Sequence, residues 1–236
     1  MSDNHEQEWV EKLPEGPFDL TKELARWREL RDVVMPVDVV ARMDRATTEL
    51  AASQILAQVV AVGGRAPSFV LPNAVGKEVS LDRLLARGPV VISFYRGVWC
   101  PFCNLEQRAL QQALPQITAL GASLVAISGM TPDNSMSMVE RLGLTYEVLT
   151  DAGLLVARRY GLVFELPEYL RQAYFRMGHP IPQFNGTTEH TLPIPATLVV
   201  DTGGIIRFAY ANPNYMHRAD PADVLAALAA LGGVVG

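Results

Sequence analysis

The only two cysteines of this chain stand three positions apart, directly after a long apolar run, and this arrangement limits the possible folds most. The run Pro89–Tyr95 is typical of a buried strand. Pro101 favours the first position of a helix, so Cys100 is predicted to be its N-cap residue and Cys103 its third residue. Residues three apart share a helix face, so the two sulfur atoms are expected to close a short disulfide loop. The pattern predicts a redox dithiol at a strand-to-helix junction.

The two cysteines are expected to differ in reactivity. The partial positive charge and free N–H groups of a helix N-terminus favour the thiolate at Cys100, which is the predicted nucleophile. Cys103 stands between Phe102 and Leu105, close to both, and is expected to be shielded, which suits a resolving thiol. Arg96, four residues before Cys100, is expected to add positive charge beside its sulfur.

Half of a zinc site is an alternative for a Cys-x-x-Cys pair, and two buried, unreactive cysteines are another. Zinc needs two further ligands, and the chain has no other cysteine. Its histidines are scattered along the sequence: His5, His179, His190 and His217. The ligand count and the proline between the cysteines favour the dithiol, so neither a metal nor a cofactor is expected.

Length and charge limit the class of protein. With 236 residues, 49% of them hydrophobic, the chain is expected to be globular, with one domain and an N-terminal extension. The net charge of −5 gives no basic surface for nucleic acid or an anionic membrane. The acidic start of the chain differs from a signal peptide, and no apolar run is long enough to span a bilayer. We expect a cytoplasmic protein whose disulfide is transient.

Residues 1–62 are predicted to form a helical extension. Apolar side chains at helix spacing predict one helix over Phe18–Met35, and a second amphipathic helix is predicted over Val37–Val60. These helices form either a homodimer surface or a layer packed on the core. Residues 63–236 are predicted to form the redox domain.

Strand and helix patterns alternate from Gly63 onward. The predicted strands are Ser68–Leu71, Val90–Tyr95, Ala122–Ser128, Tyr146–Leu149, Ala196–Asp201 and Ile205–Tyr210. The predicted helices are Pro101–Leu120, Thr131–Leu142, Gly153–Tyr160 and Pro221–Leu231. A crossover helix between parallel strands, followed by a terminal hairpin and a helix, indicates a thioredoxin-like α/β fold with a mixed sheet flanked by helices.

The segment at about 162–195 is a long insertion rich in proline and aromatic residues. It is expected to form either a lid that shapes an apolar pocket near the cysteines or a packed surface excursion. The residues expected to line such a pocket are Phe102, Tyr169 and Phe184. His179 and His190 are expected to be exposed loop histidines rather than acid–base groups, and Glu106 is expected on a solvated helix face rather than as a proton relay.

Three stretches resemble the peroxiredoxin-like branch of the alkyl hydroperoxide reductase and thiol-specific antioxidant family: Ala66–Pro72, Ser93–Cys103 and Pro195–Arg207. The resemblance runs from Gly63 toward the C-terminus. It implies a thioredoxin fold in which a peroxidatic cysteine attacks a hydroperoxide, becomes a sulfenic acid and is rescued by a second thiol. Cys100 matches the peroxidatic position.

The chain departs from that family's pattern at three positions. Ser93 stands where the family usually has a proline, and Gly97 stands where it has a threonine or serine. Pro195 replaces an arginine that the family commonly places just before the first strand of the terminal hairpin. A proline facing a Cys-x-x-Cys pair, with Trp99 before the first cysteine, is thioredoxin-like and predicts a cis Ile194–Pro195 bond.

Two enzymatic functions therefore stay open. Peroxide reduction needs donors aimed at the leaving oxygen, and Arg96, backbone N–H groups and Ser93 or Thr197 are the candidates. Disulfide exchange needs only a low-pKa thiol, a partner thiol and an accessible groove. We expect a dithiol oxidoreductase, with hydroperoxide reduction ahead of thioredoxin- or glutaredoxin-like disulfide exchange, and Trp99, Pro101, Pro195 and Thr197 in supporting roles.

A non-enzymatic redox sensor is a third alternative, and recruitment to a specialised metabolite is a fourth. The expected partners are a hydroperoxide or small disulfide and an external thiol reductant, such as a thioredoxin or a low-molecular-weight thiol.

Overall fold

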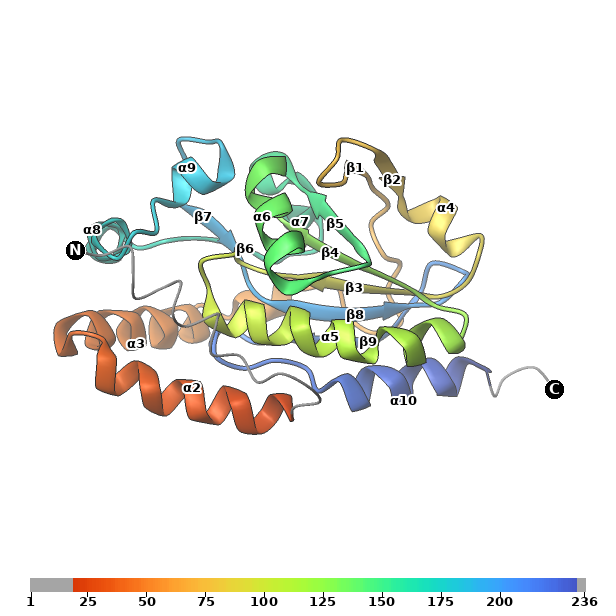
Figure 1. The fold of residues 1–236 in the computed structure, drawn as a ribbon, viewed down its shortest axis with the longest axis horizontal. Coiled ribbons are helices and arrows are strands. Elements are labelled where there is room, and N and C mark those ends of the chain that lie inside the picture. The colour runs from red at the N-terminus through yellow and green to blue at the C-terminus, as the bar shows by residue number, and fades with distance from the viewer. Residues whose placement is uncertain (1–18, 233–236) are drawn as a thin grey trace.

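The computed structural model describes residues 19–232, and a five-stranded mixed sheet lies at its centre (Figure 1). The strands follow the order β5-β4-β3-β8-β9 across the sheet. Their bounds are β3 (Val90–Phe94), β4 (Ser123–Ser128), β5 (Glu147–Thr150), β8 (Ala196–Val200) and β9 (Ile206–Ala211). The β3–β4 and β4–β5 pairs are parallel, and the β3–β8 and β8–β9 pairs are antiparallel. The mixed sheet and its terminal hairpin confirm the fold predicted from the sequence.

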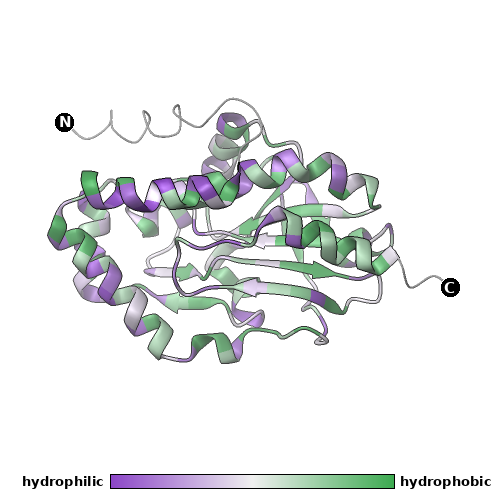
Figure 2. Cartoon of the chain, turned by 90° about the horizontal axis from the view of Figure 1, so that it is seen from below, coloured by the Kyte–Doolittle hydropathy of each residue, from purple (hydrophilic) through white to green (hydrophobic). Residues whose placement is uncertain are grey.

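Helices cover both faces of this sheet. One face carries α2 (Leu20–Val34), α5 (Pro101–Ala119), α6 (Pro132–Leu142) and α10 (Pro221–Gly232). The other carries α4 (Leu81–Leu85), α7 (Leu155–Arg159) and the short turns η1 (Ile55–Gln58) and η2 (Ala152–Leu154). Every residue of β3 is buried, and the central strands in Figure 2 are coloured mainly as hydrophobic. A strand buried on both faces reads as a continuous apolar run, which is why β3 is recognisable in the sequence.

The N-terminal helices pack on the core. Leu24 and Trp27 of α2 are buried in the same cluster as the inner face of α5. The helix begins after Asp19, whose carboxylate accepts a hydrogen bond from the Lys22 N–H at 3.1 Å. The predicted start of this helix, Phe18, lies outside the described residues. The second helix, α3 (Val37–Ala52), ends earlier than predicted because Gln54 adopts a left-handed backbone with a φ of 56°. Of the two alternatives for these helices, packing on the core is the one the structure bears out.

The insertion contains a small sheet and two helices. They are β6 (Val163–Glu165), α8 (Glu168–Arg176), α9 (Ile181–Asn185) and β7 (Thr191–Pro193). Strands β6 and β7 pair with each other in antiparallel register, and α8 contacts α3. A further hairpin, β1 (Val70–Pro72) with β2 (Glu78–Ser80), precedes the sheet. Its second strand is missing from the sequence prediction because three residues are too few for a periodic pattern.

The predicted cis bond between Ile194 and Pro195 is wrong, because the described residues contain no cis peptide bond. The backbone N–H of Ile194 donates to the Leu162 carbonyl at 2.7 Å, which holds the chain extended between β7 and β8. No helix within residues 19–232 is both long and apolar enough to cross a membrane.

Candidate active site

Cys100 stands at the N-terminal end of α5, as the sequence predicts. It is the N-cap residue with φ −94° and ψ 111°, and Pro101 occupies the first helical turn. The Cys100 carbonyl accepts hydrogen bonds from the N–H groups of Cys103 and Asn104 at 3.0 and 3.1 Å. Both cysteines are free thiols, and they are only 2% and 0% exposed. The start of α5 therefore holds two buried sulfur atoms.

Arg96 brings a buried positive charge to Cys100. Its Nη1 lies 4.0 Å from the Cys100 Sγ, and its Nη2 donates a hydrogen bond to the Tyr174 hydroxyl. The guanidinium carbon lies 5.0 Å from the Trp99 ring centre and 4.5 Å from that of Tyr215. These aromatic faces hold the cation in place without neutralising it.

Arg218 stands in the same relation to Cys103. Its Nη2 donates to the Cys103 Sγ at 3.2 Å, and its Nε donates to the Glu106 carboxylate at 2.6 Å. The second oxygen of Glu106 accepts a hydrogen bond from the Thr197 hydroxyl at 2.9 Å. The Arg218 and Glu106 side chains are 1% and 2% exposed. The expectation that Glu106 faces solvent is therefore wrong, because the first turns of α5 are buried on every side.

The environment gives the two thiols opposite tendencies to ionise. Burial disfavours the Cys100 thiolate, but the hydrogen bond from Cys103 and the charges of Arg96 and Arg218 outweigh it and lower the Cys100 pKa to about 5. Burial and the neighbouring Cys100 thiolate raise the pKa of Cys103 well above its ordinary value. Burial also raises the pKa of Glu106 to about 7, against the pull of Arg218.

The side chains at the family's diagnostic positions are engaged elsewhere. The Ser93 hydroxyl accepts a hydrogen bond from Gln107 at 2.9 Å, and Thr197 is bonded to Glu106 as described. A Cβ atom placed on Gly97 would lie 2.3 Å from the Trp99 indole nitrogen, so the indole occupies the space that a threonine would need. The polar groups that reach the sulfur atoms are the two guanidinium groups and backbone N–H groups.

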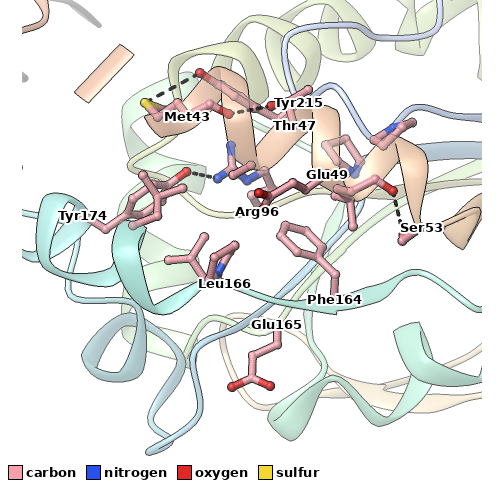
Figure 3. A pocket seen from close by; sticks show the side chains of 16 residues that line it. Met43, Thr47, Glu49, Ser53, Arg96, Phe164, Glu165, Leu166, Tyr174 and Tyr215 are labelled. Atoms are coloured by element: carbon pink, nitrogen blue, oxygen red, sulfur yellow. Dashed lines mark hydrogen bonds between the residues drawn. The ribbon is translucent and has the colours of Figure 1, made fainter. Parts of the chain in front are cut away.

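The pocket next to this site differs from the predicted one. A cavity of about 220 Å³ lies between α3 and the insertion, and Figure 3 shows Arg96 beside Tyr174 and Tyr215 within it, with Phe164 and Leu166 on the opposite side. Pro195 also lines it.

None of the three side chains expected to line a pocket lines this one. Phe102 packs inward against the Tyr215 ring, with centres 5.6 Å apart. Tyr169 of α8 faces α3, where its hydroxyl donates to Glu49 at 2.7 Å and its ring centre lies 4.3 Å from the guanidinium carbon of Arg45. Phe184 belongs to α9, and its carbonyl caps the start of α6 by accepting the Thr131 N–H at 3.0 Å. Other side chains therefore line the cavity beside Arg96, and a role of these three residues in a substrate pocket stays a prediction from the sequence.

The histidines of the insertion are half-buried rather than exposed as expected. The His179 ring lies 5.2 Å from the Trp99 ring, and no described hydrogen bond joins His190 to either cysteine. Within residues 19–232, no three His, Cys, Asp or Glu side chains gather in a way that would hold a metal ion.

The sequence does not predict the place of four side chains at this site: the buried Glu106, Tyr174, Tyr215 and Arg218. The spacing of Glu106, three residues after Cys103, places both on one helix face and is a usable signal. The other three lie far along the chain from Cys100, and only the folding of the insertion and of the segment before α10 brings them to the site.

The AhpC/TSA family model matches residues 62–209, which is more than half of the chain. The chain belongs to this family. The family recognition made from the sequence is thereby confirmed, and the match ends before Tyr215 and Arg218.

Two relatives of this AhpC/TSA protein carry different names. Chloroplastic peroxiredoxin Q from Gentiana triflora is 28% identical over 153 residues, which cover 65% of this chain and 60% of the relative. The thiol-disulfide oxidoreductase ResA from Geobacillus thermodenitrificans is 33% identical over 104 residues, covering 44% of this chain and 59% of the relative. The chain thus spans about three fifths of the length of these relatives.

Solved structures support the fold of the AhpC/TSA domain. Peroxidoxin BcpB from Mycobacterium tuberculosis superposes with a TM-score of 0.57 at 23% identity, covering 72% of this chain and 97% of that structure. Helices α2 and α3 lie outside the family match.

Proposed function

We propose that this protein is a thiol-dependent oxidoreductase that reduces hydroperoxides, with Cys100 as the peroxidatic and Cys103 as the resolving thiol. One observation carries the proposal: within an AhpC/TSA domain, a thiol with a pKa lowered to about 5 lies at a helix start, 4.0 Å from a buried guanidinium. A thiolate with a fixed cation beside it is the nucleophile that attack on an O–O bond requires.

In the first step the Cys100 thiolate attacks the terminal oxygen of a hydroperoxide ROOH. An S–O bond forms, the O–O bond breaks, and the alkoxide RO⁻ leaves with the bonding electron pair and takes up a proton to give ROH. Cys100 is oxidised to a sulfenic acid. Arg96 lies where its N–H groups donate to the developing negative charge on the leaving oxygen.

In the second step Cys103 attacks the Cys100 sulfenic acid. The S–S bond forms, the S–O bond breaks, and the hydroxyl leaves as water after accepting a proton. Burial contributes most to the raised pKa of Cys103, and the neighbouring Cys100 thiolate adds to it. Oxidation of Cys100 removes that second cause, and Arg218 at 3.2 Å then favours the Cys103 thiolate. The order of the two ionisations thus matches the order of the two steps.

An external dithiol or two thiols restore the reduced state by supplying two electrons and two protons. A thioredoxin-type protein or a low-molecular-weight thiol as reductant, a cytoplasmic location and a homodimer stay predictions from the sequence.

Thiol–disulfide exchange without peroxide reduction is the second candidate. The relative named thiol-disulfide oxidoreductase favours it, as do the Pro195 and Trp99 positions. In that function Cys100 attacks a substrate disulfide, and Cys103 releases the mixed disulfide.

Stopped-flow oxidation of the reduced protein separates the two candidates. Trp99 contacts the guanidinium at the site, so tryptophan fluorescence reports the change. We expect hydrogen peroxide or an organic hydroperoxide to oxidise the wild type far faster than free cysteine, and Cys100→Ser to abolish the reaction. Fast oxidation by a small disulfide, with peroxide no faster than with free cysteine, contradicts the peroxidase proposal and supports the exchange function.

A further inference from the structure

The cavity between α3 and the insertion has apolar walls and one charged end. Its apolar side chains come from α3 on one side and from β6 and α8 on the other, and they include Ala46, Leu50, Phe164 and Leu170. Arg96 lies at the charged end, beside two tyrosine rings (Figure 3). Neither cysteine belongs to the lining. A molecule held in this cavity therefore acts on the dithiol through Arg96 rather than by contact with a sulfur atom.

Arg96 is a buried cation whose neighbours are mostly uncharged. It is 2% exposed, and the rings of Trp99, Tyr174 and Tyr215 surround its guanidinium. Within residues 19–232, no carboxylate is among the groups that favour its charged form. The anion beside it is the Cys100 thiolate, whose Sγ lies 4.0 Å from the Arg96 Nη1. The reduced dithiol thus balances the charge of this arginine.

Oxidation removes that balance. When Cys100 and Cys103 form a disulfide, the thiolate charge disappears and the Arg96 guanidinium stays buried without a counter-ion. An unpaired buried charge is costly. The Arg96 Nε also has no hydrogen-bond partner among the described residues, and a buried donor of this kind indicates an acceptor that a bound molecule supplies. The oxidised protein therefore favours an anion beside Arg96 more strongly than the reduced protein does.

The shape and chemistry of the cavity indicate the class of anion. Its volume is about 220 Å³, and an apolar cavity of about 150 Å³ is enough to hold benzene. A body of about the size of one aromatic ring therefore fits its walls. A carboxylate matches the planar guanidinium group and forms short, charge-assisted hydrogen bonds with it.

Two acidic side chains of the lining do not supply this anion. Glu49 is paired with Arg45 at 2.7 Å, and Glu165 is paired with Arg171 at 2.6 Å. Figure 3 shows the Glu165 carboxylate directed away from Arg96. The charge that would balance Arg96 in the oxidised protein has to come from outside the chain.

Resting on the Cys100–Cys103 dithiol of the proposed function, we propose that this cavity binds a small carboxylate with an alkyl or aryl body, and binds it more tightly in the disulfide form. The carboxylate accepts hydrogen bonds from Arg96, and the apolar body lies against α3 and the insertion. Because coupling between two sites is reciprocal, such a ligand stabilises the disulfide against reduction. Helix α3 lies outside the family match, so this regulatory site is built partly from an addition to the AhpC/TSA domain.

Isothermal titration calorimetry of the full-length protein with benzoate tests the proposal. One sample is fully reduced, and the other is oxidised with diamide, which takes up two electrons and two protons from the two thiols. We expect the dissociation constant of benzoate to be on the order of tenfold lower for the oxidised protein, a coupling of ordinary size. Benzamide has the same ring without the charge and is expected to bind weakly and equally to both forms. Thiol titration of each sample verifies its redox state.

The reciprocal effect is measured in the redox equilibrium with reduced and oxidised dithiothreitol. Saturating benzoate is expected to shift the midpoint potential of the dithiol by about 30 mV to more negative values, because tenfold in the equilibrium constant of a two-electron couple corresponds to that shift. Benzamide, or sodium chloride at the same ionic strength, should leave the midpoint unchanged.

Two variants locate the site. Ala46→Trp fills the cavity from α3 and is expected to abolish benzoate binding. Ala41→Trp is its matched control, because Ala41 lies exposed on the same helix and does not line the cavity. Arg96→Met is expected to remove the preference for benzoate over benzamide, and Arg96→Lys to restore part of it. Circular dichroism checks that each variant is folded.

The comparison of redox states uses the wild type alone, so it does not depend on the folding of a variant. Absence of saturable benzoate binding, equal affinity in the two redox states, or equal binding of benzoate and benzamide overturns the proposal while the dithiol chemistry stands. Retained binding in folded Ala46→Trp overturns the assignment to this cavity. If thiol titration finds no disulfide after oxidation, the dithiol of the proposed function is wrong as well.

Discussion

Arg96 lies beside Cys100 and Arg218 beside Cys103, so each sulfur atom has a guanidinium of its own. The two cations differ in what else they contact. Arg96 is surrounded by aromatic rings that leave its charge available, whereas Arg218 shares its charge with the Glu106 carboxylate. The first arrangement suits a group that lowers a neighbouring pKa, and the second suits one that holds a structure together.

Replacing Arg96 by Met is expected to raise the pKa of Cys100 from about 5 by about one to three units, because a close opposite charge has an effect of that size. Only the thiolate is reactive, so alkylation of the wild type rises with pH through about 5 and is level near neutrality, whereas the variant's rate still climbs there. Thiolate absorbance against pH, measured in a Cys103→Ser background, gives the midpoint. Arg96→Lys retains the charge and most of the shift. An unchanged midpoint in Arg96→Met would contradict the assignment.

Replacing Arg218 by Met leaves the Glu106 carboxylate buried without its partner, and the free energy of unfolding is expected to fall by about 3–5 kcal/mol. Urea denaturation of the reduced protein measures this change in the free energy of unfolding. The control is Arg207→Met, which breaks the partly exposed pair with Asp201 and is expected to cost less than about 1 kcal/mol. Adding Glu106→Gln to Arg218→Met should recover part of the loss. Equal losses in the two arginine variants would argue against a structural role for the buried pair.

At the scale of the elements, the loop between β3 and α5 determines how the site departs from its family. The Trp99 indole packs over Gly97 and against the Tyr174 ring of α8. The centres of the Trp99 and Tyr174 rings are 5.7 Å apart. The position where the family usually has a threonine is therefore filled by an aromatic side chain that also anchors the insertion.

Gly97→Thr is expected to destabilise the protein by about 1–3 kcal/mol, because the new side chain collides with a rigid, packed indole. The cost should be much smaller when the same change is made in Trp99→Ala, which provides the room. A double-mutant cycle by chemical denaturation measures the coupling between the two positions. If the two costs simply add, the indole is not what excludes a side chain at Gly97.

At the scale of the whole molecule, the N-terminal helices belong to the same core as the sheet. Trp27 is 6% exposed and lies in one cluster with residues of α5 and α10. Arg31 of the same helix forms an ion pair with Asp44 of α3 at 2.7 Å and lies 3.5 Å from the Tyr215 hydroxyl. The helices thus connect to the rings around Arg96.

Trp27→Ala is expected to lower the free energy of unfolding by about 3–5 kcal/mol and to leave a single transition. Val33→Ala on the same helix, where the side chain is 81% exposed, should change it by less than about 0.5 kcal/mol. Circular dichroism during thermal unfolding distinguishes the outcomes. A separate early transition in Trp27→Ala would mean that the extension folds independently of the core.

Much of this molecule could be predicted from its sequence, because the decisive signals are local. The buried β3 and the proline after Cys100 identify the sheet, the helix start and the dithiol. The pocket and Arg218 could not be predicted, because their positions depend on how segments far apart in the chain pack together. Neither periodicity nor a motif encodes which side chains line the cavity between α3 and α8. Tyr174 lines it, whereas Tyr169 packs against Glu49 and Arg45 of α3.

The burial of both sulfur atoms has a consequence for the speed of the proposed catalytic cycle. The sulfur atoms are 2% and 0% exposed, so the thiol of another protein cannot come into contact with them in this conformation. Reduction by a protein therefore waits for the first turn of α5 to open locally. As the concentration of such a reductant rises, the rate of reduction should level off at the frequency of that opening, whereas a small thiol should show no such ceiling. The same burial that would protect a Cys100 sulfenic acid from other thiols would then limit the turnover of the proposed peroxidase.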